Sequence, residues 1–306
     1  MLGVGDDCAL LPISHGYQMA VSTDMLVQGQ HFFPDVDAAA LGHKALAVNL
    51  SDLAAMGARP LACTLALSLP KVDHAWLRGF SDGFHALARQ AQCPLLGGDT
   101  TRNPEGVVIS VTVMGEVRRS HALRRDAAKP GDDIWVSGSL GAPEIALRLM
   151  RGDLAGNPGL LAATRKALEM PVPRWRFGRQ LVGIARAAVD ISDGLLQDLG
   201  HILDASSCAA ELAYDALPVA PALDKVDESL RRAAVLGGGD VYELCFTAAP
   251  VRREQLMSVA RRCAVPISRV GSIVRGRGLR VSGIPEAELT AAMHGFDHFR
   301  HNEAVT

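Results

Sequence analysis

The sequence predicts an α/β protein of two domains, residues 1–127 and 128–306. At 306 residues the chain is long for a single hydrophobic core, so two domains are the ordinary expectation. Strand-like and helix-like segments alternate along its first part. A turn signal at residues 129–132 (Lys-Pro-Gly-Asp) is followed by a fresh apolar segment, which indicates a boundary there.

In the first domain, three strands and two helices are expected. Residues 17–22 and 61–69 are apolar or alternating, as in strands, and residues 107–113 are rich in β-branched side chains. Residues 41–58 are rich in Ala and Leu and predict a helix, and residues 73–92 predict a second one. The alternation of these segments favours a sheet with helices packed against it.

The second domain begins with a strand at residues 134–136. Helices are expected near residues 143–150, 174–186 and 193–205, and the last of these has a clear amphipathic stripe. Further strands are expected near residues 243–247 and 269–274. The chain contains no tandem repeat and no low-complexity tract.

Composition and charge exclude several classes of protein. Apolar residues make up 48% of the chain and charged residues 21%, as in ordinary globular proteins. Lys and Arg total 31 against 33 Asp and Glu, so no basic excess marks a nucleic-acid-binding surface. An anionic ligand must therefore be met by local devices such as metal ions, backbone N–H groups or single arginines.

The cysteines and the apolar runs predict a cytoplasmic protein with no membrane partner. No two cysteines form a C-x-x-C pair, which favours buried thiols in a reducing compartment over disulfides or a zinc site. The apolar run at residues 61–69 is too short to cross a bilayer. No signal peptide begins the sequence. The cysteines are Cys8, Cys63, Cys93, Cys208, Cys245 and Cys263.

Four aspartates have unusual positions. Each follows a short apolar or glycine-rich run and lies beside hydroxyl residues or glycines, as at the ends of strands. Strand ends that turn through glycine are where α/β proteins gather ligand groups. The four are Asp24, Asp99, Asp190 and Asp240.

Asp52 differs from these because it lies inside an otherwise apolar helix, one turn from Asn49. An ionised carboxylate there costs several kcal/mol unless it is paired or bound to a metal. The alternative is that Asp52 lies on a narrow exposed edge of the helix.

Carboxylates without a matching set of His or Cys select hard cations such as magnesium, which is usually shared between carboxylates and substrate phosphates. Several acids in one cleft would repel one another without such cations, so they imply a polyphosphate partner. Ser22 and Thr23 offer further oxygen ligands, and Gly97-Gly98 lets the backbone approach a phosphate. Ser192 and Asp193 suit either an anion site or the simple capping of a helix that begins at Gly194.

The sequence lacks the motifs of two common classes of nucleotide-binding enzyme. The chain has no G-x-x-x-x-G-K-[ST] sequence and no protein-kinase catalytic loop. His31 is a lone histidine in a loop, and such a residue is more often on the surface than in a site.

Taken in order, the motifs of this chain resemble those of the thiamine-monophosphate kinase family, within the superfamily of aminoimidazole ribonucleotide synthetase and selenophosphate synthetase. The ordered set is specific, although no single piece is. It comprises residues 5–9 (Gly-Asp-Asp-Cys-Ala), 22–24 (Ser-Thr-Asp), 44–58, 97–101 (Gly-Gly-Asp-Thr-Thr), 190–195 (Asp-Ile-Ser-Asp-Gly-Leu) and the closing 295–299.

The resemblance implies a magnesium-dependent enzyme that transfers the γ-phosphoryl group of ATP to thiamine monophosphate, giving thiamine diphosphate and ADP. It implies a two-domain fold like that of aminoimidazole ribonucleotide synthetase and a homodimer whose N-terminal domains pair. Residues 1–127 would then bind ATP and magnesium and form the dimer, and residues 128–306 would complete the site.

The resemblance also assigns residues by motif. It gives no catalytic acid or base, which suits an acceptor phosphate that is already anionic near neutral pH, and we expect direct in-line transfer. Its implied ATP contacts are Gly98, Arg125 and Ser192, and its implied thiamine monophosphate contacts are His31, Asp240 and Phe296. Its implied magnesium ligands are Asp7, Ser22, Thr23, Asp24, Asp52, Asp99, Asp190 and Asp193.

Two features depart from the family pattern. The family sequence Gly-Gly-Glu-Asp-Tyr-Glu-Leu is replaced here by residues 238–244, Gly-Gly-Asp-Val-Tyr-Glu-Leu. Relatives also carry further residues before the Gly-Asp-Asp motif. Two rival functions stay open: another ATP-dependent member of the superfamily that acts on a different small molecule, and a non-catalytic protein that binds a nucleotide or thiamine.

Overall fold

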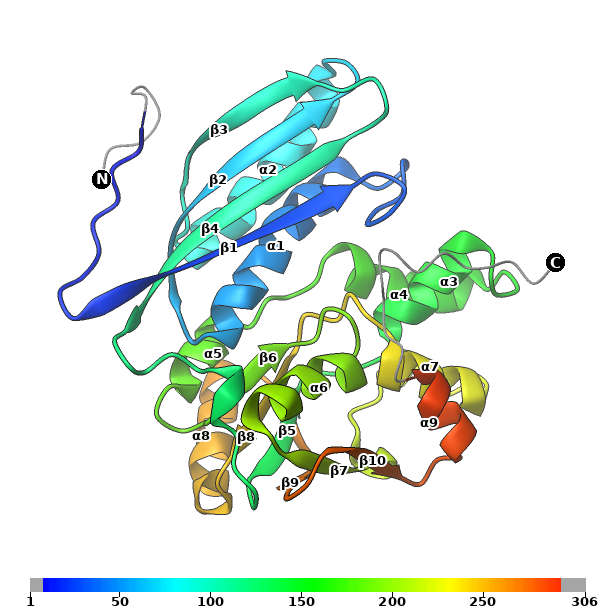
Figure 1. Cartoon of the computed structure of the whole chain (residues 1–306). Coiled ribbons are helices and arrows are strands. Elements are labelled where there is room, and N and C mark those ends of the chain that lie inside the picture. The colour runs from blue at the N-terminus through cyan, green and yellow to red at the C-terminus, as the bar shows by residue number, and fades with distance from the viewer. Residues whose placement is uncertain (1–7, 293–306) are drawn as a thin grey trace.

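The structure is a computed structural model that describes residues 8–292 as two stacked units, each built on a sheet (Figure 1). The elements of the first unit are β1 (Tyr17–Val27), α1 (Ala38–Ala55), β2 (Arg59–Leu69), α2 (His74–Ala91), β3 (Leu95–Arg102) and β4 (Val108–Arg118). The elements of the second unit are β5 (Asp133–Ser137), α3 (Ala142–Arg151), α4 (Pro158–Glu169), α5 (Trp175–Leu181), β6 (Ala188–Asp190), α6 (Leu195–Ser206), β7 (Ala209–Ala213), α7 (Glu228–Gly237), β8 (Leu244–Ala248), α8 (Arg253–Cys263), β9 (Ile267–Val274), β10 (Gly278–Ser282) and α9 (Glu286–Ala292).

The first sheet has the strand order β1-β4-β2-β3. Its β1/β4 and β4/β2 pairs are antiparallel, and β2 and β3 are parallel because α2 connects them. The second sheet has the order β10-β7-β9-β5-β8-β6, and it places the short β6 at one edge. A linker that contains the short 3-10 helix Arg125–Ala127 joins the units. The domain boundary after residue 127 stays a prediction.

Helix α1 is the element that both units share. It is buried nearly all round, which explains why its sequence is apolar on every side. It packs against the first sheet and α2, and also against α5 and β6 of the second unit. An apolar cluster extends across this junction and contains Leu50 of α1 together with Phe177 of α5 and Phe246 of β8. The two units therefore share buried packing at α1.

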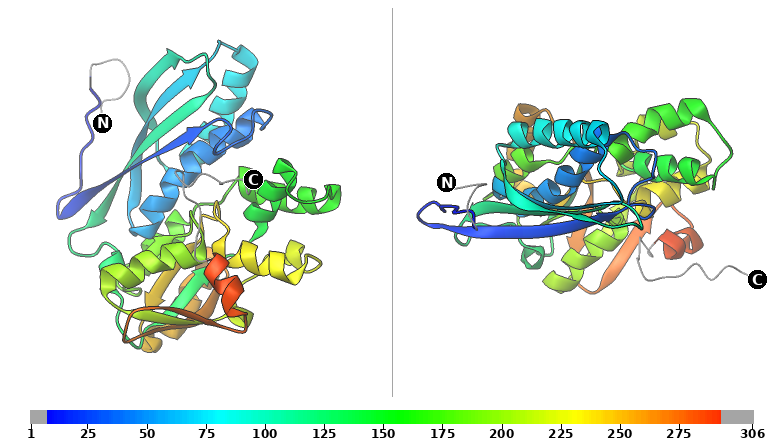
Figure 2. Two further views of the ribbon diagram at one scale, coloured as in Figure 1. Left: turned by 45° about the vertical axis from the view of Figure 1, so that its right-hand side comes forward. Right: turned by 90° about the horizontal axis from the view of Figure 1, so that it is seen from above.

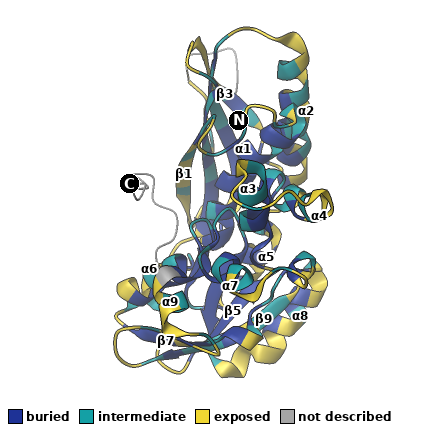
Figure 3. Cartoon of the chain, turned by 90° about the vertical axis from the view of Figure 1, so that its right-hand side faces the viewer, coloured by how far each residue is buried: buried dark blue, intermediate teal, exposed yellow. Residues whose placement is uncertain are grey.

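One face of the first sheet has no helix on it among the described residues, whereas α1 and α2 cover the other (Figure 2). Alternate side chains of β1 point to this open face, and apolar residues among them are exposed. Figure 3 shows the exposed colour along β1 at this side of the molecule. The exposed apolar side chains are Tyr17, Met19, Val21 and Met25.

Several expectations about elements need correction. Asp24 and Asp99 lie inside β1 and β3, not at strand ends, because both strands continue for three further residues along the sheet. The helix expected at residues 174–186 ends at Leu181, since Val182 is extended and Gly183 has a φ of 79°. Helices α4, α7, α8 and α9 and strands β7 and β10 were not predicted from the sequence.

Among the described residues, no helix has the length and apolar character needed to cross a membrane. The six cysteines are free thiols; four are buried, while Cys8 is exposed and Cys263 is intermediate.

The contact between α5 and α1 leaves no room for a side chain at Gly178, because a Cβ there would lie 2.1 Å from the Ala54 backbone oxygen. We predict that Gly178→Ala lowers the free energy of unfolding by about 1–3 kcal/mol, as overpacking does. The matched control is Gly200→Ala in α6, where a Cβ meets nothing within 4 Å. That change should raise stability by about 0.4–1 kcal/mol. Urea unfolding of both variants tests this, and equal stability of the two would contradict it.

Candidate active site

Two polar residues of α1 meet the middle of β1. The Ser22 hydroxyl donates to Asp52 Oδ2 at 2.5 Å, and the Asp24 backbone N–H donates to Asn49 Oδ1 at 3.0 Å. Residues three apart share a helix face and residues two apart share a strand face, so these pairs align when α1 lies across β1. Asp52 is therefore half-buried and held toward the sheet, instead of lying on an exposed edge.

The turn between β6 and α6 brings a second group of acids to the same place. Asp190 ends β6 and is only 4% exposed. The backbone N–H groups of residues 192–194 all donate to Asp198 Oδ2, at 3.0 to 3.1 Å. The N-cap of α6 is Gly194. The Asp193 carboxylate accepts a hydrogen bond from the Gln197 side chain in the first turn of α6, and Asp198 organises the turn that precedes the helix.

The carboxyl groups of Asp24, Asp52, Asp190 and Asp193, called the acid cluster from here on, act on one another electrostatically. Burial first, and then the charges of Asp52 and Asp193, raise the pKa of Asp24 to about 7. Burial, followed by Asp52, raises the pKa of Asp190 to about 8. These shifts show that the negative charges are concentrated where little water screens them.

Positive charge near the cluster is scarce among the described residues. Burial raises the pKa of Asp52, whereas the Ser22 hydrogen bond and the charge of Arg125 lower it. Arg125 is thus close enough to act on the cluster. Its side chain is exposed at the linker between the two units.

The donor set of the cluster fits a hard cation such as magnesium, since it consists of carboxylates with hydroxyl oxygens beside them. The Ser51 hydroxyl is fully buried and lies close enough to Asp190 to offset part of the rise in its pKa. The geometry between them is not that of a well-formed hydrogen bond, and the hydroxyl has no other partner among the described residues. In residues 8–292, no three His, Cys, Asp or Glu side chains are grouped closely enough to hold a metal by themselves. A bound cation would therefore need further oxygens, such as those of a phosphate.

A second group of residues lies around Lys44, about two helical turns before Asp52 in α1. The Lys44 ammonium contacts Asp240 Oδ1 at 3.0 Å and donates to the His31 backbone oxygen at 3.3 Å. The His31 ring accepts the Val27 N–H through Nδ1. The structure thus links His31 and Asp240, two residues implied to contact the acceptor, through a lysine that the sequence analysis did not select.

Three of the implied residues lie apart from the acid cluster within one chain. The Thr23 hydroxyl bonds to that of Thr112 at 2.8 Å on the open sheet face. Asp99 is in register with Met25 across two intervening strands, so about 14 Å of sheet separates them. Gly98 lies inside β3, where a Cβ would be 1.8 Å from the Leu65 backbone oxygen, so its lack of a side chain serves strand packing.

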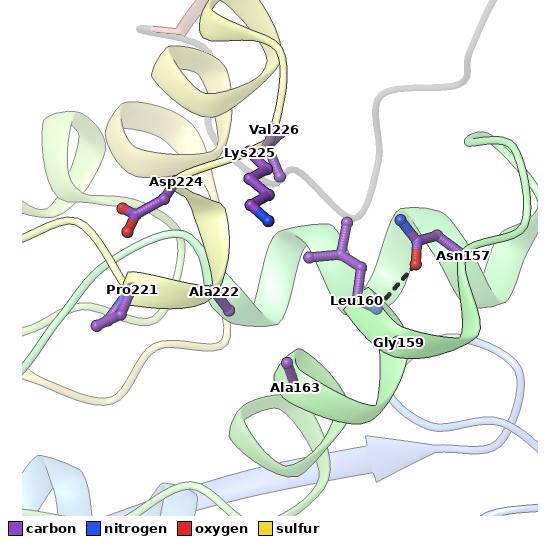
Figure 4. Close-up of a pocket in the computed structure, with 9 residues that line it drawn as sticks. All are labelled: Asn157, Gly159, Leu160, Ala163, Pro221, Ala222, Asp224, Lys225 and Val226. Atoms are coloured by element: carbon purple, nitrogen blue, oxygen red, sulfur yellow. Dashed lines mark hydrogen bonds between the residues drawn. The ribbon is translucent and has the colours of Figure 1, made fainter.

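Asp7 and Phe296 lie outside the described residues. A separate hollow of about 480 Å³ opens between the start of α4 and residues 221–226, with Leu160 and Lys225 in its wall (Figure 4). It contains none of the implied site residues. The acid cluster, not this hollow, is therefore the candidate active site.

Comparisons with known proteins cover nearly the whole chain. Residues 5–117 match the N-terminal domain of the AIR synthase related proteins, and residues 129–284 match the C-terminal domain. The thiamine-monophosphate kinase of Salmonella typhimurium is 43% identical over 303 residues, which cover 97% of this chain and 91% of that protein. The chain belongs to the thiamine-monophosphate kinase family of AIR synthase related proteins.

Two solved structures of the thiamine-monophosphate kinase family support the fold. The crystal structure from Stenotrophomonas maltophilia is 48% identical with a TM-score of 0.87, and the match covers 92% of this chain and 91% of that one. AaThiL complexed with AMPPCP and TMP is 27% identical with a TM-score of 0.79, and the match covers 90% of this chain and 86% of that one.

Lys44 and Asp198 are the site residues that the sequence analysis missed. Lys44 could have been selected from the sequence. Like Asp52, it is a charged residue in an apolar helix, so its burial carries the same kind of free-energy cost. Asp198 gave no such signal, since an acid in the first turn of a helix is common. The family motifs are recognised from their order along the chain. Asp198 is not part of them, and its hydrogen bonds to residues 192–194 form only in the folded protein.

Without divalent cations, stability should depend on pH through the acid cluster. Between the ordinary carboxyl pKa of 3.8 and the raised Asp190 pKa of about 8, the folded chain binds more protons than the unfolded chain. The free energy of unfolding should therefore fall as the pH rises through this window. Added magnesium should reduce the fall.

Urea unfolding in a chelating buffer across this pH range measures the effect. Asp190→Asn, which removes one of the groups with a raised pKa, should make the dependence shallower. An equally steep fall in the variant and the parent would contradict the role given to Asp190.

Proposed function

We propose that this chain catalyses magnesium-dependent transfer of the γ-phosphoryl group of ATP to thiamine monophosphate, giving thiamine diphosphate and ADP. The observation that carries the proposal is the acid cluster, formed between α1, β1 and the β6–α6 turn in a chain of this family. The complex of the relative AaThiL with AMPPCP and TMP supports the same pair of substrates.

The chemistry requires two anions to meet in line. The acceptor phosphate is already ionised near neutral pH, so no general base is needed, and we assign no catalytic acid or base. Magnesium, when bound, would neutralise the β- and γ-phosphates and orient both ends of the displacement. We therefore propose direct transfer without a phosphorylated protein residue.

The residues of this chain hold and orient the reactants. Asp24, Asp52, Asp190 and Asp193 would hold magnesium, and the Ser22 hydroxyl fixes the orientation of the Asp52 carboxylate. Arg125 and Ser192, on either side of the cluster, would contact ATP.

Around Lys44, His31 and Asp240 would contact thiamine monophosphate, together with Phe296. Asp240 is partly exposed there and can receive a ligand. Val241, which replaces the family's acidic residue, is buried.

We also propose a homodimer in which the open faces of two first sheets pair. Exposed Met19, Val21 and Met25 form an apolar strip there, which suits burial against a second copy. Thr23 lies on the same face. We keep Thr23 and Asp99 as proposed magnesium ligands and Gly98 as a proposed ATP contact. They lie apart from the acid cluster of their own chain, and in the dimer they would face a nucleotide bound at the partner sheet. Asp7 remains proposed by motif alone.

We place the reaction in the cytoplasm. The free, mostly buried thiols suit a reducing compartment, and nucleoside triphosphate consumption suits the same location.

A single assay tests the function. Purified chain, thiamine monophosphate, ATP and magnesium should yield thiamine diphosphate and ADP in equal amounts. Turnover only with a different acceptor would favour another member of the superfamily, and magnesium–ATP binding without any product would favour a non-catalytic binding protein.

Substitution of the acids separates their roles. We predict that Asp52→Asn lowers kcat by about 10²–10³-fold, because it removes charge that acts on the transferring group. Asp240→Asn should mainly raise KM for thiamine monophosphate, with kcat changed far less. Steady-state kinetics at saturating magnesium, with melting temperatures as a check on folding, measure both. A near-normal kcat for Asp52→Asn would refute its metal role.

The dimer makes a separate prediction. Val21→Glu places a charge in the middle of the apolar strip that β1 presents on the open face, and it should convert the dimer to monomers. Val251→Glu is the matched control, since Val251 is 85% exposed in the second unit, away from that face. Sedimentation velocity of both variants measures the outcome, and a dimer that tolerates Val21→Glu but not Val251→Glu would sink the proposed interface.

A further inference from the structure

Lys44 is an unusual residue for its position. It lies in α1, among apolar neighbours, and its side chain is 3% exposed. A buried ammonium is costly unless charge and hydrogen bonds compensate it, so its partners carry information about why it is there.

Its two partners come from different parts of the chain. The His31 backbone oxygen belongs to the loop after β1 in the first unit, and the Asp240 carboxylate belongs to the segment between α7 and β8 in the second. Lys44 therefore connects two loop segments that share no helix or sheet with each other.

Asp240 is held by more than this ion pair. The Tyr242 hydroxyl donates to the same oxygen, Asp240 Oδ1, at 3.0 Å. Asp240 and Tyr242 have φ values of 59° and 55°, a strained conformation for residues other than glycine. The backbone N–H groups of both residues donate to the β6–α6 turn at 2.8 Å, one to Ser192 and one to Ile191.

The burial of the pair is uneven. The Lys44 side chain is almost inaccessible, whereas the Asp240 side chain is 28% exposed. Two donors, the Lys44 ammonium and the Tyr242 hydroxyl, meet at one oxygen of a carboxylate whose side chain stays partly exposed.

We propose that Lys44 is a positioning residue for the acceptor: by tying the His31 loop to Asp240 it sets the geometry with which these two residues meet thiamine monophosphate. The inference rests on the proposed function. It gives the lysine no contact with ATP, because its two partners, the His31 loop and Asp240, are implied to contact the acceptor.

Kinetics of Lys44→Met test the inference, since methionine keeps the length and loses the charge. KM for thiamine monophosphate should rise at least about tenfold, because His31 and Asp240 would no longer be held where they contact the acceptor. KM for ATP should stay within about twofold. Lys225→Met, a change of an exposed lysine in the wall of the separate hollow, is the matched control and should leave both KM values unchanged.

Further variants distinguish positioning from mere stabilisation. Lys44→Arg keeps charge and donors and should restore part of the lost acceptor affinity. In the double variant Lys44→Met/Asp240→Asn, KM for thiamine monophosphate should be close to that of Asp240→Asn alone, because the two residues act as one unit. Additive effects of the two changes would count against the inference.

Tyr242→Phe keeps the test decisive if Lys44→Met does not fold. It removes the other donor to Asp240 Oδ1 and should also raise KM for thiamine monophosphate and not for ATP. Its control is Tyr214→Phe, since the buried Tyr214 hydroxyl has no hydrogen-bond partner among the described residues.

The results separate the two proposals. If the parent enzyme does not use thiamine monophosphate, the proposed function fails. If the parent is active but Lys44→Met or Tyr242→Phe lowers only the melting temperature, with both KM values unchanged, then Lys44 is structural and this inference alone is overturned.

Discussion

Asp24, Asp52 and Asp190 come from three separate elements and face one another where burial removes most of the water that would screen them. Burial and mutual repulsion hold the pKa of Asp24 at about 7 and that of Asp190 at about 8. A fold that keeps these groups together stores an unfavourable interaction, which bound cations and phosphates would relieve. The surrounding structure has to be rigid enough to maintain it.

Helix α1 supplies that rigidity. It is buried on nearly all sides between the first sheet, α2 and α5, so its polar side chains have little freedom. Asn49 and Asp52 meet β1 at the acid cluster, and Lys44 reaches Asp240 about two helical turns before Asp52. One helix therefore sets both the position of the proposed phosphate-transfer site and the spacing to the proposed acceptor residues.

Much of the fold was predictable because local patterns dominate it. The five elements expected in the first unit all exist, with ends that differ by a few residues, and the alternation of strands and helices indicated the α/β class. The pattern could not reveal β3 as a strand that continues through Gly97 and Gly98, since glycine ordinarily weakens a strand. Its pairing with β2 decided that outcome, and Gly98 is needed there for close approach.

The sequence by itself determined the family of this protein, its fold class and the residue types of its site, because these depend on order along the chain and on local periodicity. Only the tertiary structure decided which of those residues meet. Ser22 and Asp24 face α1 while Thr23, between them, points to the open face, and Asp99 lies across the sheet from them. The link through Lys44 and the turn held by Asp198 also required the fold. The physical reason is that a side chain's face and its distant partners are set by sheet register and helix packing, which join residues far apart in sequence.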